Sequence, residues 1–238
     1  MSADDETDSD EEFLDRRAAA RDRIDHIAGA SSAEPDERLL WFEEVYRSAQ
    51  GDAAGVPWAD LAPKAPLVDW LARNPGDGQA RALDIACGLG DNAEALSAAG
   101  YRTSAFDLAR GAIDWARRRF PDSRVDYRVG DLFAPPEDWI AGFDLVHECY
   151  TLQALSGDLR ERGFAAVTRF LRPGGHLLVF TRTRPNDAPA SGPPWPLTPG
   201  ELARFEDLGL ERLDRTDWPT VRPDKTIPNV FIVYRRPA

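Results

Sequence analysis

Residues 81–93 read Arg81-Ala-Leu-Asp-Ile-Ala-Cys-Gly-Leu-Gly-Asp-Asn-Ala93, a short apolar run that passes through two glycines into a helix-forming segment. This order predicts a strand, a tight turn and a helix. Gly88 and Gly90 allow positive φ angles and a close approach of the backbone to a ligand, which a side chain would prevent. The helix that begins near Asp91 presents unpaired N–H groups, so we expect a nucleotide-like ligand at the turn.

The carboxylate of Asp84 narrows the class of ligand. Gly88-x-Gly90-x-x-Ala93 alone also satisfies the dinucleotide fingerprint, but the first strand of a dinucleotide-binding fold is normally apolar up to its glycines. A carboxylate just before the turn does not suit a pyrophosphate. It can hold the α-amino group of a cofactor with an amino-acid end, and S-adenosylmethionine also carries a positive sulfonium. The alternative is that Asp84 only accepts hydrogen bonds from backbone N–H groups at the strand end.

The charge of the chain is concentrated at its N-terminus. The net charge is −12 over 238 residues, and the first twelve residues contain seven acids and no base, which leaves −5 for the remainder. Such a segment has too little apolar surface to repay ordering, so residues 1–12 are predicted to be a disordered acidic tail. Lys and Arg total 29 against 41 acids and form no long basic run, which favours a small-molecule partner over nucleic acid.

The cysteine content and the hydropathy of the chain indicate in which cellular compartment the protein is expected. Cys87 and Cys149 are the only cysteines, and both fall in predicted sheet elements, which argues against a disulfide framework. No apolar run approaches the length of a membrane span, and the acidic N-terminus is the opposite of a signal peptide. We therefore expect a cytoplasmic protein that does not bind membranes. No spacing of His, Cys and Asp indicates a metal site, and the oligomeric state stays open.

The rest of the chain divides into two predicted parts. Residues 13–79 are predicted to form a helical cover, with apolar residues at helical spacing. Residues 80–238 alternate strands and helices, which predicts an α/β domain with a parallel sheet and helices on both faces. The predicted strands are 82–86, 102–106, 125–129, 143–149, 176–181, 210–217 and 230–234, with helices that include 90–99, 157–171 and 198–208. Residues 183–199 are a long proline-rich loop, and Trp195 within it favours a functional role.

Acids recur where the predicted strands end. In an open parallel sheet, ligands bind beyond the carboxyl ends of the strands, where the strand order reverses. Three acids lie at or beside the ends of successive strands: Asp107, Asp131 and Glu148. Asp107 can accept both hydroxyls of a ribose, Asp131 can accept from an adenine amino group, and Leu108 and Leu132 can enclose the ring. A lone acid at such an edge is usually a helix cap, but the set with the glycine turn indicates a bound adenosine.

Five motifs of the chain resemble the successive motifs of class I S-adenosylmethionine-dependent methyltransferases. They are Leu83-Asp84-x-x-Cys87-Gly88-x-Gly90, the strand end at Asp107, Val129-Gly130-Asp131-Leu132, Phe143-Asp144-Leu145-Val146 and Leu171-Arg-Pro-Gly-Gly175. The resemblance covers about residues 80–182. It implies a Rossmann-like, doubly wound, seven-stranded sheet, mostly parallel with an antiparallel last strand, and S-adenosylmethionine as the cofactor. The residues expected to contact this cofactor are Trp41, Asp84, Ala86, Gly88, Gly90, Asn92, Asp107, Leu108, Asp131, Leu132 and Glu148.

The N-terminal part carries a looser resemblance. Trp41-Phe-Glu-Glu-Val-Tyr46, Gly55-Val-Pro57-Trp58 and Pro66-Leu67 are similar to the cover of thiopurine, thiol and tellurite methyltransferases. In that branch the aromatic segment lies over the cofactor and helps to form the acceptor pocket, which implies contacts from Trp41 and Trp58. The alternative is that both are aromatic core under a lid. After the fourth strand, His147-Glu148-Cys149-Tyr150 replaces the Asp-Arg-Gly run of the thiopurine enzymes, which leaves the acceptor open.

The expected chemistry is an in-line displacement, in which alignment of the acceptor atom with the methyl group accounts for much of the rate. A thiol is partly ionised at neutral pH and needs no base. His147 and Glu148 are the candidates for a base if one is used. The alternatives are that Glu148 binds the cofactor amino group or caps a helix, and that His147 is hydrogen-bonded in the interior. Tyr150, Trp195 and Trp58 are expected to form the walls of the acceptor site.

The sequence therefore predicts an enzyme that transfers a methyl group from S-adenosylmethionine to a small molecule, with a thiol as the expected acceptor. Transfer to oxygen or nitrogen of a secondary metabolite is the first alternative. An NAD-dependent oxidoreductase is a second, which Asp84 disfavours, and a non-catalytic protein that only binds the cofactor is a third.

Overall fold

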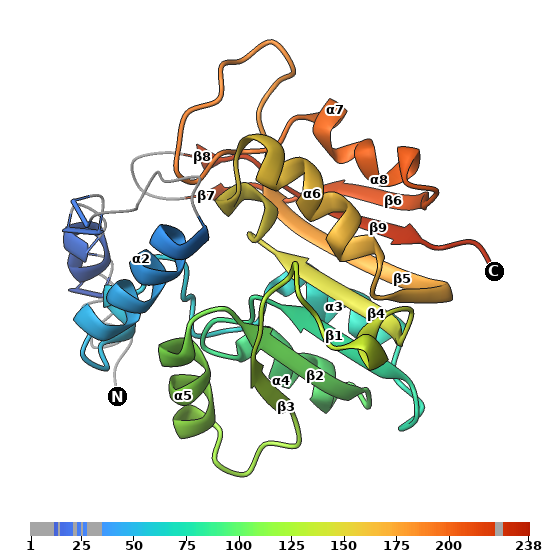
Figure 1. Ribbon diagram of the computed structural model, residues 1–238, viewed down its shortest axis with the longest axis horizontal. Coiled ribbons are helices and arrows are strands. Elements are labelled where there is room, and N and C mark those ends of the chain that lie inside the picture. The colour runs from blue at the N-terminus through green and yellow to red at the C-terminus, as the bar shows by residue number, and fades with distance from the viewer. Residues whose placement is uncertain (1–11, 14, 21–22, 25, 28–34, 222–225) are drawn as a thin grey trace.

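The computed structural model describes residues 12–13, 15–20, 23–24, 26–27, 35–221 and 226–238. All but the last residue of the predicted acidic tail, 1–12, lie outside the described residues. A twisted sheet crosses the molecule, and helices lie on both of its faces (Figure 1). Among the described helices, none has the length and apolar character needed to cross a membrane.

The main sheet has seven strands in the order β3-β2-β1-β4-β5-β9-β6. The strands are β1 (Arg81–Ile85), β2 (Arg102–Asp107), β3 (Asp126–Val129), β4 (Phe143–Cys149), β5 (Leu171–Arg182), β6 (Glu211–Asp217) and β9 (Asn229–Arg235). The first five are parallel, and β9 lies antiparallel between β5 and β6. The order reverses between β1 and β4. The predicted seven-stranded, mostly parallel sheet with an antiparallel last strand is confirmed.

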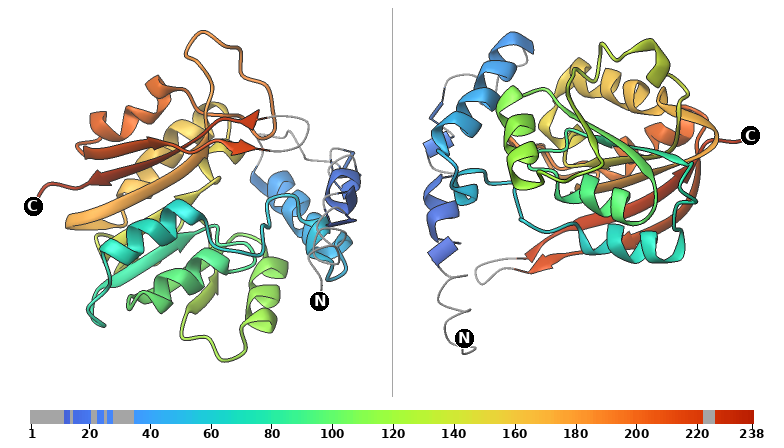
Figure 2. Two further views of the ribbon diagram at one scale, coloured as in Figure 1. Left: turned by 180° about the vertical axis from the view of Figure 1, so that it is seen from behind. Right: turned by 90° about the horizontal axis from the view of Figure 1, so that it is seen from below.

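The described helices from Pro35 onward complete the layers. They are α2 (Pro35–Ser48), α3 (Ala65–Arg73), α4 (Asp91–Ala98), α5 (Arg110–Arg119), α6 (Gly157–Thr168), α7 (Pro199–Leu202) and α8 (Arg204–Asp207), with 3-10 turns η1 (Ala53–Gly55), η2 (Glu137–Trp139) and η3 (Leu152–Ala154). Figure 2 shows α6 on one face of the sheet and α3 and α4 on the other. Because both faces are covered, the central strands are apolar on both sides, as in other parallel sheets.

Two apolar layers enclose the sheet. On one face, Leu83 and Val146 pack with Phe164 of α6, and on the other, Leu145 packs with Leu67 of α3 and Leu96 of α4. All six side chains are almost fully buried. Burial of side chains of this size contributes about 1.5–3 kcal/mol each, so the layers fix the strand register and, with it, the positions of the strand ends.

Several predicted element bounds are wrong. The strand predicted at 176–181 begins at Leu171, because Leu171 pairs with Phe143 before an irregularity in the ladder. The helix predicted to reach 171 ends at Thr168. The helix predicted at 198–208 is two short helices that meet at Ala203, although the capping box between Thr198 and Glu201 is present. A two-stranded hairpin, β7 (Thr220–Val221) and β8 (Thr226–Ile227), occupies a stretch predicted as turns.

The helix α2 is attached beside the carboxyl ends of the parallel strands. Its Glu43 accepts hydrogen bonds from Arg110 N at 2.6 Å and Gly111 N at 3.2 Å, which are the first N–H groups of α5. A carboxylate at a helix N-terminus is favoured by the helix dipole and satisfies unpaired donors. Figure 1 shows α2 next to α5, and Figure 2 shows the β7–β8 hairpin extending toward the same end of the molecule. These elements surround the strand ends.

Candidate functional site

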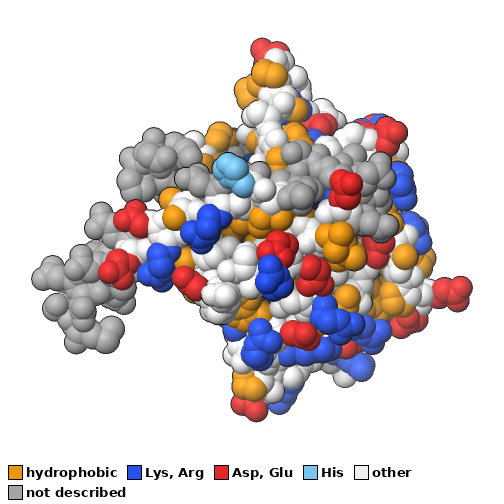
Figure 3. Space-filling view, turned by 60° about the vertical axis from the view of Figure 1, so that its left-hand side comes forward, with side chains coloured by type: hydrophobic (Ala, Val, Ile, Leu, Met, Phe, Trp, Pro, Cys, Tyr) orange, Lys and Arg blue, Asp and Glu red, His pale blue; other side chains and the backbone are white. Residues whose placement is uncertain are grey.

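A cavity of about 400 Å³ lies at the carboxyl ends of the parallel strands, under α2. Its lining includes residues of α2, of the segment before α3, of the loops that follow β1, β2, β3 and β4, of the proline-rich loop, and of the ends of β5, β7, β8 and β9. A volume of this size suits a small-molecule ligand. Figure 3 brings this side of the molecule forward and shows acidic and basic side chains around apolar ones, with several Lys and Arg side chains gathered in the lower part of the view.

The turn after β1 has the backbone conformation that its glycines predicted. Gly88 has φ +54°, Gly90 has φ +94°, and Ala86 also lies in the left-handed region at φ +50°. Gly88 and Ala86 line the cavity. Gly90 does not belong to the lining; a Cβ there would lie 2.5 Å from the hydroxyl oxygen of Tyr127. The close approach at Gly90 is therefore to a packed side chain of β3.

Asp107 connects the end of β2 to this turn. Its Oδ2 accepts a hydrogen bond from Gly88 N at 3.0 Å, and its Oδ1 accepts one from Ala109 N at 3.0 Å. Burial raises the pKa of Asp107 to about 6, although both hydrogen bonds act in the opposite direction. Each carboxylate oxygen can accept a second hydrogen bond. Asp107 lines the cavity, so those acceptors are available to ligand hydroxyls.

The loop after β3 supplies the next part of the wall. Asp131 and Leu132 line the cavity there, and Leu108 lines it from the loop after β2. Asp131 is exposed, and its Oδ1 accepts a hydrogen bond from Phe133 N at 2.8 Å. Leu132 is buried. The structure thus brings together the acid and the apolar side chains that the sequence assigned to an adenine ring.

Asp84 faces the cavity with one oxygen unused. Its Oδ1 lies 2.7 Å from Nδ1 of His147, and both side chains are buried. Within the described part of the chain, neither Asp84 Oδ2 nor His147 Nε2 has a hydrogen-bond partner. A buried acceptor without a partner costs about 1–3 kcal/mol and calls for a ligand donor. Asp84 lines the cavity, so a ligand ammonium group fits this position. His147 is outside the lining.

Glu148 serves the turn after β4. Its Oε1 accepts hydrogen bonds from Thr151 N at 2.7 Å and Leu152 N at 2.9 Å. Burial raises the pKa of Glu148 to about 7, although both backbone hydrogen bonds act to lower it. Glu148 does not contribute to the lining. The observed contacts match the capping role that the sequence left open for it.

An aromatic cluster from the N-terminal part covers the cavity. Trp41 and Trp58 both line it, with ring centroids 5.8 Å apart. Trp58 Nε1 donates to the Tyr46 hydroxyl at 3.0 Å, and Trp41 Nε1 donates to the Ile24 carbonyl at 3.2 Å. The two tryptophans are therefore packed core residues and cavity walls together. Asn92 also lines the cavity, and its Oδ1 accepts a hydrogen bond from Lys64 N at 2.9 Å.

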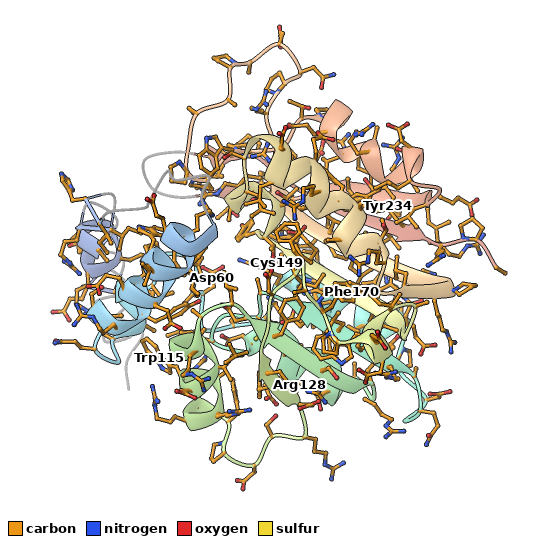
Figure 4. All side chains as sticks on the ribbon, in the orientation of Figure 1. Asp60, Trp115, Arg128, Cys149, Phe170 and Tyr234 are labelled. Atoms are coloured by element: carbon orange, nitrogen blue, oxygen red, sulfur yellow. The ribbon has the colours of Figure 1, made fainter. Side chains whose placement is uncertain are left out.

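The opposite wall begins at the end of β4. Tyr150 lines the cavity in the left-handed conformation, with φ +64°, and its hydroxyl donates to Asn229 Oδ1 at 3.2 Å. Figure 4 places Cys149 near the centre of the molecule and Asp60 toward α2. Burial raises the pKa of the Cys149 thiol well above its ordinary value, which suits a packing residue better than a nucleophile.

The proline-rich loop contacts the cavity through other residues than the sequence indicated. Trp195 is outside the lining; its N–H donates to Gln153 O at 2.7 Å, and its carbonyl accepts from Arg160 Nη2 at 3.0 Å. Pro193 and Pro194 of the same loop line the cavity instead. The loop still contributes to the site.

Sequence reasoning missed three basic residues of the lining: Arg38, Lys64 and Arg182. Arg182 ends β5, so the rule about strand ends could have found it. Arg38 and Lys64 lie in the N-terminal cover, where no local pattern marks a residue that faces the sheet. Among the residues that the structure describes, no group of three His, Cys, Asp or Glu could hold a metal ion.

Comparisons with known proteins identify relatives in sequence. Residues 82–175 match the family described as a methyltransferase domain. A ubiquinone biosynthesis O-methyltransferase from Methylocella silvestris is 32% identical over 175 residues, which cover 66% of this chain and 67% of that protein. "Probable thiol methyltransferase 2" from Arabidopsis thaliana is 25% identical over 203 residues, which cover 80% of this chain and 87% of that protein.

Solved structures agree in fold. The 1,6-didemethyltoxoflavin-N1-methyltransferase of Burkholderia thailandensis, with bound 1,6-didemethyltoxoflavin and S-adenosylhomocysteine, superposes with a TM-score of 0.67 at 20% identity, over 88% of this chain and 93% of that one. Another relative in sequence, the ubiquinone biosynthesis O-methyltransferase of Aromatoleum aromaticum, is 28% identical over 155 residues, which cover 64% of this chain and 64% of that protein. The chain therefore spans less than two thirds of the length of that relative. The matched domain and the identity to the Methylocella protein show that the chain belongs to the class I S-adenosylmethionine-dependent methyltransferases.

Proposed function

We propose that this protein transfers the methyl group of S-adenosylmethionine to a small-molecule acceptor, and that the accepting atom is a thiol sulfur. The observation that carries the proposal is one continuous cavity that joins the acids at the ends of β1, β2 and β3 to an aromatic wall beside β4. When bound, the cofactor supplies an electrophilic methyl group on a positively charged sulfur. The protein supplies position, charge and exclusion of water.

The acidic side of the cavity accounts for cofactor binding. Asp84 accepts a hydrogen bond from the ammonium group through its unpartnered Oδ2. Asp107 accepts from the ribose hydroxyls, while Gly88 N and Ala109 N hold its carboxylate in place. Asp131 accepts from the adenine amino group, and Leu132 contacts the ring. Each of these roles uses an acceptor or a surface that lines the cavity.

The absence of a suitable base in the lining favours sulfur. Nδ1 of His147 is hydrogen-bonded to Asp84, and Oε1 of Glu148 accepts a hydrogen bond from Thr151 N in the turn after β4. Neither side chain contributes to the described lining. A thiol with a pKa near 8.5 is partly ionised near neutral pH, so it reacts without a base. Both cysteines of the chain are free thiols, which suits the reducing conditions of the cytoplasm, where we place the protein.

Transfer to oxygen or nitrogen is the second candidate. The relatives support it, because two of them are named as O-methyltransferases of ubiquinone biosynthesis and a structural neighbour as an N1-methyltransferase. A phenol with a pKa near 10 needs more assistance than a thiol to ionise. An acceptor oxygen would therefore call for a base that the described lining provides only through its aspartates.

Two measurements test the proposal. Titration calorimetry with S-adenosylhomocysteine and with NAD should show binding of the first alone. Release of S-adenosylhomocysteine is then measured with matched panels of aryl thiols, phenols and amines, and the thiols should turn over fastest. Binding of NAD alone would contradict the cofactor assignment. Faster turnover of phenols or amines would show that the acceptor atom is oxygen or nitrogen and not sulfur. Tight cofactor binding without any product would indicate a non-catalytic binding protein.

A further inference from the structure

The cavity has two ends of different charge. The sheet order places β2 and β3 on one side of β1, and β4, β5 and β9 on the other. Acids alone are the charged residues of the lining at the first end: Asp84, Asp91, Asp107 and Asp131. The charged residues of the described lining at the second end are three cations and one acid: Arg38, Lys64, Arg182 and Asp60.

Tyr150 lies at the cationic end. Lys64 Nζ is 4.6 Å from the centroid of the Tyr150 ring, and Arg182 Cζ is 5.9 Å from it. Arg38 reaches the same end from α2, because its guanidinium donates to the carbonyl of Ala154 in η3. The left-handed backbone of Tyr150 is a conformation that persists only where its surroundings fix it, and such residues concentrate at functional sites.

Lys64 is the best-defined cation of the three. Its ammonium pairs with the carboxylate of Asp60, whose Oδ1 accepts a hydrogen bond from Arg17 Nη1 at 3.1 Å. One acid is thus shared between two cations. The Lys64 side chain is only 13% exposed. Burial acts to lower the pKa of Lys64, but its ionisable neighbours, Asp60 among them, raise it overall, so the ammonium is charged near neutral pH.

We propose that the methyl acceptor carries an acidic group, a carboxylate in the simplest case, and that this group binds against Lys64 at the Tyr150 end of the cavity. The inference rests on the function proposed above and adds the charge of the substrate to it. Lys64 has three N–H donors, of which the Asp60 contact uses one. Arg38 and Arg182 strengthen the positive potential, and an acceptor with an ammonium group would meet like charges there.

The same potential explains how the acceptor sulfur ionises. A positive charge nearby favours the charged form of an acid, so it lowers the pKa of a bound thiol. Asp60 is the only carboxylate at this end of the described lining. Burial acts to raise its pKa, but Lys64 and Arg17 lower it overall. Asp60 therefore stays ionised and is a poor proton acceptor, and the proton of the thiol leaves to solvent.

The test compares two probes that differ in one charge. 4-Mercaptobenzoate and 4-mercaptobenzamide are titrated by calorimetry into the full chain saturated with S-adenosylhomocysteine, at about pH 7.5, where the carboxylate is ionised. Only the acid can form a charge-assisted hydrogen bond with the Lys64 ammonium, so it should bind at least about tenfold more tightly than the amide. In Lys64→Gln, the acid should lose most of this preference while the affinity of the amide changes little.

Two further variants complete the experiment. Lys64→Arg keeps the charge and should keep the preference, which separates the role in binding from a role in folding. Arg212→Gln changes a basic residue on β6, outside the cavity lining, and should alter neither affinity. Equal binding of the two probes, equal weakening of both by Lys64→Gln, or no binding of the acid at millimolar concentration would overturn the inference. Methylation of the amide with no preference for the acid would leave the proposed function intact, whereas failure to bind S-adenosylhomocysteine would contradict that function itself.

Discussion

Asp84 of β1 and His147 of β4 are directly opposite each other in the sheet, and Asp84 Oδ1 lies 2.7 Å from His147 Nδ1 in a fully buried pair. The histidine thus fixes the orientation of the carboxylate that faces the cavity, and it does so from outside the cavity. This arrangement gives His147 a positioning role and leaves Asp84 Oδ2 for the ligand.

Replacement of His147 tests that role. His147→Leu removes the donor to Asp84 and leaves a buried carboxylate without its partner, so we expect the free energy of unfolding to fall by about 1–3 kcal/mol. His147→Gln restores a side-chain donor and should recover part of the loss. Urea denaturation measures both, and calorimetry with S-adenosylhomocysteine should rank affinity in the same order. If the leucine variant is as stable and binds as well as the parent, the pair does not orient Asp84.

Cofactor binding should depend on pH through Asp107. Its pKa is raised to about 6, chiefly by burial, and the ionised form is the better acceptor for ribose hydroxyls. Affinity for S-adenosylhomocysteine should therefore be full near pH 7 and about tenfold lower near pH 5, with proton release on binding in between. Calorimetry in buffers of different ionisation enthalpy measures the released proton. Asp107→Asn should bind weakly with no such pH dependence between 5 and 7, and a pH dependence that survives in it would assign the proton elsewhere.

Ionisation of Glu148 should make the folded protein less stable as the pH rises. Its folded pKa of about 7, raised chiefly by burial, lies above the unfolded value near 4.5. Because the folded state holds the proton more tightly, its stabilising contribution is complete below about pH 4.5 and is lost as the pH rises through 7. Glu148→Gln stays neutral, so its stability relative to the parent should increase by about 2–3 kcal/mol between pH 5 and pH 8. Parallel urea-denaturation profiles for the two proteins across this range would show that Glu148 does not titrate as stated.

Gly90 of the glycine turn and Gly174 of β5 form a matched pair for substitution. Gly90→Ala places a Cβ 2.5 Å from the Tyr127 hydroxyl at a φ of +94°, whereas Gly174→Ala has φ +78° and open space around the new atom. Strain from φ costs about 1–2 kcal/mol at each position, so Gly90→Ala should be the more destabilising by a further 1 kcal/mol or more from the clash. Thermal unfolding measures the difference, and Tyr127→Phe should relieve part of it. Equal effects of the two alanines would mean that Tyr127 moves aside without cost.

The cofactor side of the site could be predicted because its residues follow a local rule. Asp107 is the last residue of β2 and Asp131 lies two residues beyond β3, and parallel strands bring their carboxyl ends to one edge of the sheet. The acceptor side could not. Arg38 and Lys64 reach the cavity only because α2 and the segment before α3 dock over the strand ends, and that docking depends on distant contacts such as Glu43 with Arg110.

The same distinction explains the errors in the fold. The strand 143–149 was predicted with its observed bounds because its apolar residues, Phe143, Leu145, Val146 and Cys149, span the whole strand. The start of β5 depends on the pairing of Leu171 with Phe143, which no local pattern records. Trp195 was assigned to the acceptor wall from its residue type alone, but its backbone contacts with Gln153 and Arg160 leave Pro193 and Pro194 to line the cavity.

The hydrogen bond from Lys64 N to Asn92 Oδ1 ties the lysine to the first turn of the helix that follows the glycine loop. A cofactor that orders the first turn of α4 therefore also orders Lys64. Binding at the acidic end of the cavity thus favours binding at the cationic end. Thermodynamic linkage then requires the cofactor and the acceptor each to increase the affinity for the other by the same factor. The cofactor and the methyl acceptor should accordingly bind cooperatively, and Asn92→Ala should abolish this cooperativity.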